Sequence, residues 1–285
     1  MNSSQENRLH DILEMLEKGV RNVYSKDEWQ NYLKAMSRFH SYSSRNSLLI
    51  YMQKPDARLV AGYRLWNTQF NRQVRKGEKG IRILAPMRSK VIEKDTDEKK
   101  QIITGFRPVS VFDISQTDGD PVPVNLCEQL TSEVDDYSLF IEALELVSPV
   151  PVHFREIEDT SLGFYNRKEK EIVVRRGMSE SQSVKTLLHE ITHALLHDEK
   201  GNDDRVRKEI EAESVAYAVS SYYGIDTSAY SFSYIALWSN DQETAVLKDS
   251  LATIQKTSDH LIRLINHVRN PVPGSRNRKP AEYRM

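Results

Sequence analysis

Two histidines and a glutamate near residue 190 have the spacing of a metal-dependent hydrolase. The sequence reads His-Glu-x-x-His at His189, Glu190 and His193. On a helix, residues four apart lie on one face, so both imidazoles can reach the same cation. Glu190 adjoins the first histidine, where its carboxylate can accept a proton from a water molecule that the metal acidifies. The pattern therefore predicts a zinc site with Glu190 as the general base.

A third ligand distinguishes such a site from a chance match, because catalytic zinc usually has three protein ligands and one open position. The metzincin pattern is excluded, since Leu196 and Glu199 occupy its glycine and histidine positions. A second helical segment offers Glu209 and Glu213 on one face, with Glu211 pointing away from both. We assign Glu209 as the third ligand and Glu213 as the residue that supports a ligand histidine by hydrogen bonding.

The sequence also contains polar side chains near this site that are not assigned as ligands. His197 continues the histidine face by one turn, but a fourth protein ligand would close the open position. We therefore expect His197 to be a surface histidine at the helix end.

A peptidase also needs a group that stabilises the oxyanion. The sequence does not choose among its candidates, Tyr217, Tyr222, Tyr223, Tyr230 and Tyr234.

Composition indicates a globular protein with room for two modest domains. The chain has 285 residues, of which 39% are hydrophobic and 28% charged, and its longest apolar runs are too short to cross a membrane. Cys127 is the single cysteine, which excludes an intramolecular disulfide and a cysteine-ligated zinc site. The first residues contain no secretory apolar segment, so the expected location is the cytoplasm.

A basic block in the first half suggests a polyanionic partner for that half alone. From Arg58 to Lys90 there are nine basic residues and one acidic residue, a net charge of +8. The whole chain has a net charge of −1, so the remainder carries −9. Such asymmetry is typical of a protein in which one region binds nucleic acid.

Aromatic residues interleave with these basic residues, which is the combination that binds single-stranded nucleic acid. Guanidinium and ammonium groups contact phosphates, while aromatic rings stack on unpaired bases. From composition alone, the alternative stays open that the aromatic residues are core and the charges only solvated. No helix-turn-helix, zinc-finger or RRM pattern supports reading of duplex sequence. The candidate contacts are Arg38, Tyr42, Arg45, Arg64, Trp66, Arg72, Arg75, Lys76, Lys79 and Arg82.

Apolar periodicity and turn residues divide the chain into two α+β portions. The first portion has helices followed by a small antiparallel sheet, with helices at 6–19, 27–39, 44–52 and around Trp66, strands at 81–84 and 108–114, and an exposed hairpin tip at 93–100. The second portion is mainly helical with a short sheet, with strands at 152–154 and 171–174 and helices at 137–146, around the two metal-ligand segments, at 234–238 and at 242–268. The expected boundaries are a first domain at 1–117, a linker at 118–135, a second domain at 136–269 and a disordered basic tail at 270–285.

Several blocks in the first portion resemble the N-terminal domain of ArdC-like antirestriction proteins. They follow one another in the family's order between residues 5 and 117, at 36–43, 46–50, 60–63, 85–87, 111–117 and Lys76-Gly77-Glu78-Lys79-Gly80-Ile81. That family is carried on conjugative plasmids and transposons, and the resemblance implies that this domain binds single-stranded DNA.

The second portion is similar to the zinc-peptidase domain that follows in the same family and is related to the ImmA/IrrE peptidases. The resemblance implies zinc ligands at His189, His193 and Glu209, with Glu190 as the base, the HExxH…E arrangement of gluzincin-type enzymes. Related peptidases often have Asp or Asn where this chain has Glu213, which leaves the supporting role of Glu213 open.

These observations predict a cytoplasmic protein of a mobile element that binds single-stranded DNA, counteracts restriction and carries a zinc metallopeptidase-like domain. The alternative is a DNA-responsive regulatory zinc protease that cleaves a repressor or host protein. The expected partners are single-stranded DNA and a protein substrate, and no membrane.

Overall fold

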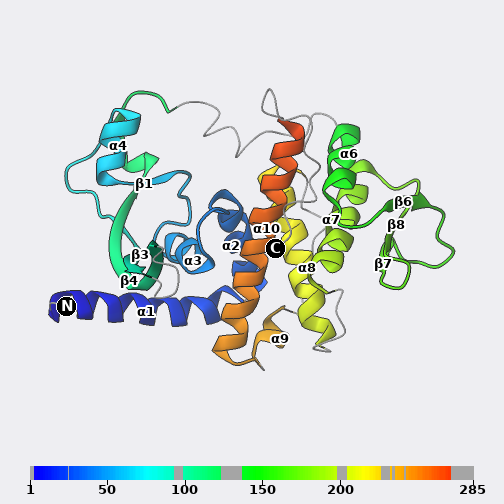
Figure 1. Ribbon diagram of the computed structural model, residues 1–285, viewed down its shortest axis with the longest axis horizontal. Coiled ribbons are helices and arrows are strands. Elements are labelled where there is room, and N and C mark those ends of the chain that lie inside the picture. Colours follow the sequence, from blue (N-terminus) through cyan, green and yellow to red (C-terminus); the bar gives the residue numbers. More distant parts are fainter. Residues whose placement is uncertain are drawn as a thin grey trace.

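The protein folds as helices with short sheets at either side. A computed structural model describes residues 3–24, 26–92, 99–122, 137–197, 204–225, 232, 235–240 and 242–270. Helices occupy the centre, an antiparallel sheet lies on the N-terminal side, and a mixed sheet lies on the far side (Figure 1). The predicted α+β class, with N-terminal helices and a small antiparallel sheet, is confirmed.

Three helices open the chain, α1 (Ser3–Val23), α2 (Lys26–Arg38) and α3 (Ser44–Gln53). All three lie where apolar periodicity predicts them, although α1 extends beyond the predicted 6–19 at both ends. Helix α3 begins after Ser43, whose side chain accepts a hydrogen bond from the Asn46 N–H. It ends before Pro55, because the residue preceding a proline disfavours helical geometry.

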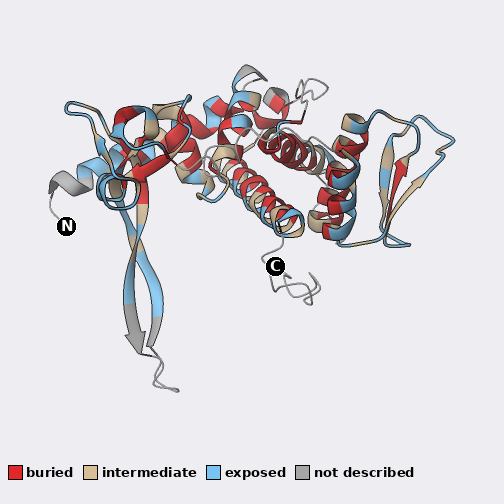
Figure 2. Ribbon diagram, turned by 90° about the horizontal axis from the view of Figure 1, so that it is seen from above, coloured by how far each residue is buried: buried red, intermediate tan, exposed pale blue. Residues whose placement is uncertain are grey.

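The N-terminal sheet continues into a long two-stranded arm. Its strands pair antiparallel in the order β1-β4-β3, with β1 at Val60–Gly62, β3 at Ile81–Ile92 and β4 at Lys99–Asp113. The predicted strands 81–84 and 108–114 are only the inner ends of β3 and β4, whose outer parts project from the body (Figure 2). The predicted hairpin tip lies largely outside the described residues.

A second pair of strands closes this half beside the short helix α4 (Tyr63–Phe70). Strands β2 (Arg72–Val74) and β5 (Thr117–Gly119) are antiparallel, and the 3-10 turn η1 (Ile114–Gln116) joins β4 to β5. The first two residues of the predicted linker, 118 and 119, therefore pair with β2, and the linker from 123 onward lies outside the described residues. The domain boundaries stay a prediction.

Two amide side chains of α3 cap the outer edge of strand β3. Gln53 accepts from the Arg82 N–H and donates to the Arg82 carbonyl, each at 2.9 Å. Asn46 does the same with Leu84, also at 2.9 Å. The two side chains thus take the place of a neighbouring strand. The main-chain N–H and carbonyl groups of Arg82 and Leu84 at this edge are therefore all hydrogen-bonded.

The C-terminal half packs helices against a small mixed sheet. Strand β6 (Val152–Arg155) runs parallel to β8 (Glu171–Arg175), and β7 (Gly163–Asn166) pairs antiparallel with the other edge of β8. Strand β7 was not predicted, because it begins with Gly163 and ends with Asn166, residue types that are typical of turns. The helices are α6 (Tyr137–Val147), α7 (Glu180–Leu196), α8 (Arg205–Tyr222), α9 (Ile235–Asn240) and α10 (Thr244–Arg269).

The helices of both halves share one hydrophobic core. A single cluster of buried residues runs from Ile12 on α1 to Ile265 on α10. Trp29 on α2 is fully buried, and its indole N–H donates to the Ser214 hydroxyl on α8 at 3.1 Å. The Tyr24 hydroxyl donates to the Leu247 carbonyl on α10 at 2.9 Å. Packing thus ties the N-terminal helices directly to the helices of the C-terminal half.

Among the described helices, none combines the length and the apolar character that crossing a bilayer needs. The predicted tail, 271–285, lies outside the described residues.

Candidate metal centre

Helix α7 positions the predicted histidine pair. Ser179 caps its first turn by accepting a hydrogen bond from the Gln182 N–H. Apolar residues on the remaining faces, such as Leu188 and Ile191, are fully buried and fix the helix in the core. The helix therefore presents its one polar stripe to a pocket.

The three predicted ligands converge in this structure. The Nε2 atoms of His189 and His193 lie 3.0 Å apart. Glu209, from α8, places one carboxylate oxygen 3.3 Å from His189 Nε2 and the other 3.6 Å from His193 Nε2. Donor atoms about 2.0–2.1 Å from a tetrahedral zinc lie about 3.3–3.4 Å from each other. The donor set and its spacing therefore fit a divalent metal ion.

The electrostatics of the cluster favour a positive charge between these groups. Burial lowers the pKa of His189, but hydrogen bonds with Glu209 and Glu213 outweigh burial and raise this pKa to about 9. Hydrogen bonds with His189 and His193 hold the pKa of Glu209 well below its usual range. A site that attracts a proton in this way also attracts a metal cation, which would take the proton's place.

Glu190 faces the same pocket and belongs to none of these ion pairs. Its side chain lines a pocket of about 570 Å³ together with the three donor residues, and Glu190 is only 8% exposed. Burial raises the pKa of the Glu190 carboxyl, a shift that the nearby His189 and His193 oppose. A buried carboxylate beside the donor cluster is well placed to accept a proton.

Strand β7 forms the wall of the pocket opposite the histidines. The carboxylate of Glu190 accepts a hydrogen bond from the main chain of Tyr165 on β7. Gly163 allows this approach, because a Cβ atom there would lie 2.6 Å from the Thr186 methyl group on α7. Tyr165 also lines the pocket. It is a functional candidate that sequence reasoning missed, since the fold alone brings β7 to α7.

Glu213 lies behind His189. One of its carboxylate oxygens is 3.3 Å from His189 Nδ1, on the side of the ring away from the donor cluster. The other is 3.2 Å from the ammonium group of Lys185. The carboxylate can thus orient the His189 ring and favour the tautomer whose Nε2 is free to bind a metal.

His197 is not the surface residue that the sequence predicts. It is 6% exposed, and its Nδ1 lies 2.9 Å from Nδ1 of His193. Its Nε2 lies 3.4 Å from Glu211, which accepts a 2.7 Å hydrogen bond from Arg207. The four side chains form a buried chain that ends on His193. The continued four-residue spacing from His189 and His193 was the available signal, and burial decided its meaning.

Replacing His197 with alanine is expected to weaken metal binding by about 10- to 100-fold without removing a ligand. The substitution deletes the partner of His193 Nδ1, and such supporting groups typically contribute to metal affinity by that factor. Competition with a chromogenic chelator measures the affinity. His267→Ala, at an exposed position of α10, is the matched control and should bind metal as the wild type does. Unchanged affinity in the His197 variant would show that this chain does not position His193.

Of the five tyrosine candidates for the oxyanion, the three that the structure describes do not line the pocket. Tyr217, Tyr222 and Tyr223 are buried, at 6%, 4% and 2% exposure, and none of them lines the pocket. Tyr230 and Tyr234 lie outside the described residues. Tyr165 and Arg205 line the pocket instead.

Several of the predicted DNA contacts have structural partners within the protein. Trp66 is fully buried and its indole N–H donates to the Phe112 carbonyl at 2.9 Å, so a base cannot stack on it in this structure. The Arg72 guanidinium donates to acceptors of residues 117–120 and holds β5 against β2. Arg75 pairs with two carboxylates at 2.8 Å and 3.3 Å. The residue types of these three side chains suggested contacts with DNA, but in this structure each of them contacts other parts of the protein.

The other predicted DNA contacts differ in exposure. Arg38 donates to the Pro55 carbonyl at 2.9 Å, and the Tyr42 hydroxyl donates to the Val60 carbonyl at 3.3 Å. Arg82 is half-buried and lines a separate pocket. The exposed ones are Arg45, Arg64, Lys76 and Lys79.

A His-Glu-x-x-His helix, a glutamate ligand candidate from the next helix and a small sheet along the pocket are together typical of a metallopeptidase-like domain. Comparisons with known proteins agree with this class. Residues 150–220 match the IrrE N-terminal-like domain family, peptidase M78, and residues 2–112 match the N-terminal domain of anti-restriction factor ArdC. The chain thus joins an ArdC N-terminal domain to an M78 peptidase-like domain, as the resemblance predicted.

Solved structures show the same fold over most of the chain. The metal-free antirestriction protein ArdC from plasmid R388 superposes with a TM-score of 0.51 at 19% identity, over 80% of this chain and 85% of that one. Its Mn(II)-bound structure gives a TM-score of 0.50 at 19% identity, over 81% and 86%. An uncharacterized protein of Bacillus anthracis, pXO2-81, is 25% identical over 281 residues, covering 81% of this chain. The chain spans 46% of the length of that relative.

Proposed function

We propose that this protein binds single-stranded DNA and counteracts restriction of DNA that enters a cell with a mobile element. The match of residues 2–112 to the ArdC N-terminal domain and the net charge of +8 between Arg58 and Lys90 support this proposal. Its place of action is the cytoplasm, where incoming DNA meets restriction enzymes. Bound protein would cover the strand before it becomes a duplex substrate.

For the C-terminal half we propose a zinc metallopeptidase. The observation that carries it is the convergence of His189, His193 and Glu209 beside the separate carboxylate of Glu190 in one pocket. Two histidines and a glutamate are a common donor set of catalytic zinc, and one open position remains. When bound, the metal would supply Lewis acidity and lower the pKa of a water molecule.

The side chains of this protein would contribute the remaining steps. Glu190 would accept the proton of the water molecule and pass it to the leaving amine. Glu213 and His197 would hold the two histidine rings in orientation, as their contacts with His189 and His193 indicate. Strand β7 is an edge strand of its three-stranded sheet, and it lines the pocket. An extended peptide could pair with that edge, which favours a protein substrate.

One observation supports an alternative, in which DNA binding regulates the protease so that it cleaves a repressor or host protein. Trp29 of the ArdC domain contacts Ser214, which directly follows Glu213 on α8. A strand that shifts α2 could therefore change the position of the metal-site helix. The two functions differ in whether Glu190 is needed for the biological effect.

The DNA-binding half of the proposal predicts a preference for single strands with strong salt dependence. We expect the full chain to bind a labelled oligothymidine at least about tenfold more tightly than a duplex of the same length, because exposed rings such as Tyr63 and Phe106, at 61% and 40% exposure, can stack on unpaired bases. Affinity should fall linearly on a log–log plot of salt, with a slope of about −0.7 for each phosphate contacted. Fluorescence anisotropy measures both. Equal affinity for the two forms, or no salt dependence, would contradict the proposal.

A further inference from the structure

An arginine-lined pocket lies between α1 and the N-terminal sheet and contains none of the metal-centre residues. Its volume is about 430 Å³. Its charged lining residues are Arg8 on α1, Arg82 on β3 and Arg107 on β4, and the described lining residues include no carboxylate. The remaining lining residues are Gly80, Met87, Pro108, Val109 and Ser110. Two of these three arginines, Arg8 and Arg107, lie outside the predicted set of DNA contacts.

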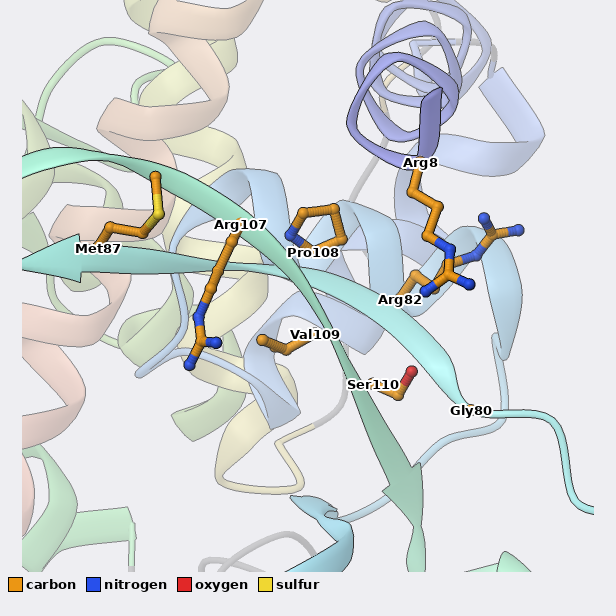
Figure 3. A pocket seen from close by; sticks show the side chains of 8 residues that line it. All are labelled: Arg8, Gly80, Arg82, Met87, Arg107, Pro108, Val109 and Ser110. Carbon is orange, nitrogen blue, oxygen red and sulfur yellow. The ribbon is translucent and has the colours of Figure 1, made fainter. Parts of the chain in front are cut away.

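The arginines have little neutralising charge around them. The carboxylate of Asp11 lies 3.9 Å from Arg82, and the two side chains are 60% and 43% exposed, so water screens this pair strongly. Within the described part of the chain, Arg8 and Arg107 form no ion pair. Figure 3 shows Arg8 and Arg82 lining the same pocket, and two like charges that share a pocket repel each other. A bound anion would relieve that repulsion.

The wall that carries Arg82 is fixed before any ligand binds. Gln53 holds both main-chain groups of Arg82, each at 2.9 Å. Gly80 packs so closely on β4 that a Cβ atom would lie 2.8 Å from the Cβ of Ser110. Ser110 brings a hydroxyl group to the same pocket. A wall with a fixed main chain that carries cationic and hydroxyl donors suits phosphate oxygens, because charge-assisted hydrogen bonds to phosphate are strong.

The arrangement suits a chain of phosphates better than one compact anion. In Figure 3, Arg107 lies apart from Arg8 and Arg82 along strand β4, so the three cations follow a path across the pocket. Consecutive phosphates of a nucleic-acid strand present negative charges along such a path, whereas a single phosphate could meet only the Arg8–Arg82 pair. By contrast, Arg72 and Arg75 are engaged by acceptors of the fold.

We infer that Arg8, Arg82 and Arg107 bind consecutive phosphates of single-stranded DNA. This inference rests on the proposed function, and it places the strand across α1 and the base of the β3–β4 arm. Arg8 and Arg107 are then contacts for which the basic block gave no signal, since both lie outside it in the sequence.

The test compares Arg8→Gln, Arg107→Gln and the double variant with the full-length wild type in anisotropy titrations of a labelled oligothymidine. Each single variant is expected to bind about three- to tenfold more weakly. The salt slope should become shallower by about 0.7 for each arginine removed, because each loses one phosphate contact. Arg263→Gln is the matched control, since Arg263 is an arginine of α10 whose side chain is 63% exposed and which belongs neither to the pocket nor to the predicted DNA contacts. It should bind with the wild-type slope. Melting curves verify that all variants fold.

The possible outcomes separate the inference from the function on which it rests. Wild-type affinities and salt slopes in both pocket variants, with a wild type that binds the strand, would overturn the pocket site and leave the proposed strand binding intact. A wild type that does not bind the oligothymidine would overturn both. Inorganic phosphate serves as a competitor. The concentration of phosphate that displaces half of the strand is compared with the concentration of chloride that does the same. If phosphate acted at a much lower concentration than chloride, the pocket would hold a compact anion, and the strand path would be wrong.

Discussion

Replacing Glu190 with glutamine is expected to lower any peptide hydrolysis by about 10²–10⁴-fold while metal content stays at the wild-type level. Glu190 is the buried carboxylate of the pocket that pairs with neither histidine. Glutamine keeps its size and its capacity to accept the hydrogen bond from β7, but it cannot accept a proton. Cleavage of a quenched fluorescent peptide mixture and metal analysis of the purified protein give the two readouts.

Glu180→Gln is the matched control, because Glu180 is an exposed glutamate in the first turn of the same helix. It should retain full activity and metal. A Glu190 variant that lost its metal would show that this carboxylate is a ligand, and one that hydrolysed peptides normally would remove it as the general base.

The same variant distinguishes the two proposed functions in a conjugation assay against a restricting host. Protection that survives Glu190→Gln would indicate that covering the strand is sufficient. Protection that is lost, with oligothymidine binding unchanged, would favour the regulatory protease.

Replacing Trp29 with alanine is expected to destabilise the whole chain by about 3–5 kcal/mol, including the metal centre. Trp29 is fully buried, stacks on Tyr24 at 4.4 Å and donates to Ser214 at 3.1 Å. Its removal leaves a large cavity and an unpaired hydroxyl group at the contact between α2 and α8. Because α8 also carries Glu209 and Glu213, unfolding should be one transition that metal shifts upward and the substitution shifts downward.

Calorimetry with and without zinc measures this coupling. Leu139→Ala, at a position on α6 that is 59% exposed, should change stability by less than about 0.5 kcal/mol and serves as the control. The calorimetry could instead show two separate unfolding transitions, with Trp29→Ala lowering the temperature only of the one that zinc does not shift. That result would show that the two halves unfold independently.

Much of the candidate metal centre could be predicted because its geometry is local. The spacing of His189 and His193, and of Glu209 and Glu213, fixes each pair on one face of its own helix. The sequence analysis had to assume only that the two helices α7 and α8 pack against each other. In the structure, Glu209 on α8 lies 3.3 Å from His189 and 3.6 Å from His193 on α7. The helices and the antiparallel sheet of the first half were predictable for the same reason, since apolar periodicity reports the nearest buried face.

The role of a polar or aromatic side chain was less predictable where it depended on burial. His197 and Glu211 are 14 positions apart, yet they meet in the core at 3.4 Å. Trp66 and Arg72 have the residue types of a strand-binding surface, but the fold uses both internally. Arg8 and Arg107 lie far apart in the sequence and line one pocket.

The sequence by itself determined which side chains could bind a metal and which half of the chain is basic. The tertiary structure decided that β7 brings Tyr165 to Glu190, that His197 lies against His193, and that the helices of both halves share one core. The reason is that helical spacing acts over one or two turns, whereas burial and the partner of each polar group depend on elements distant in the chain.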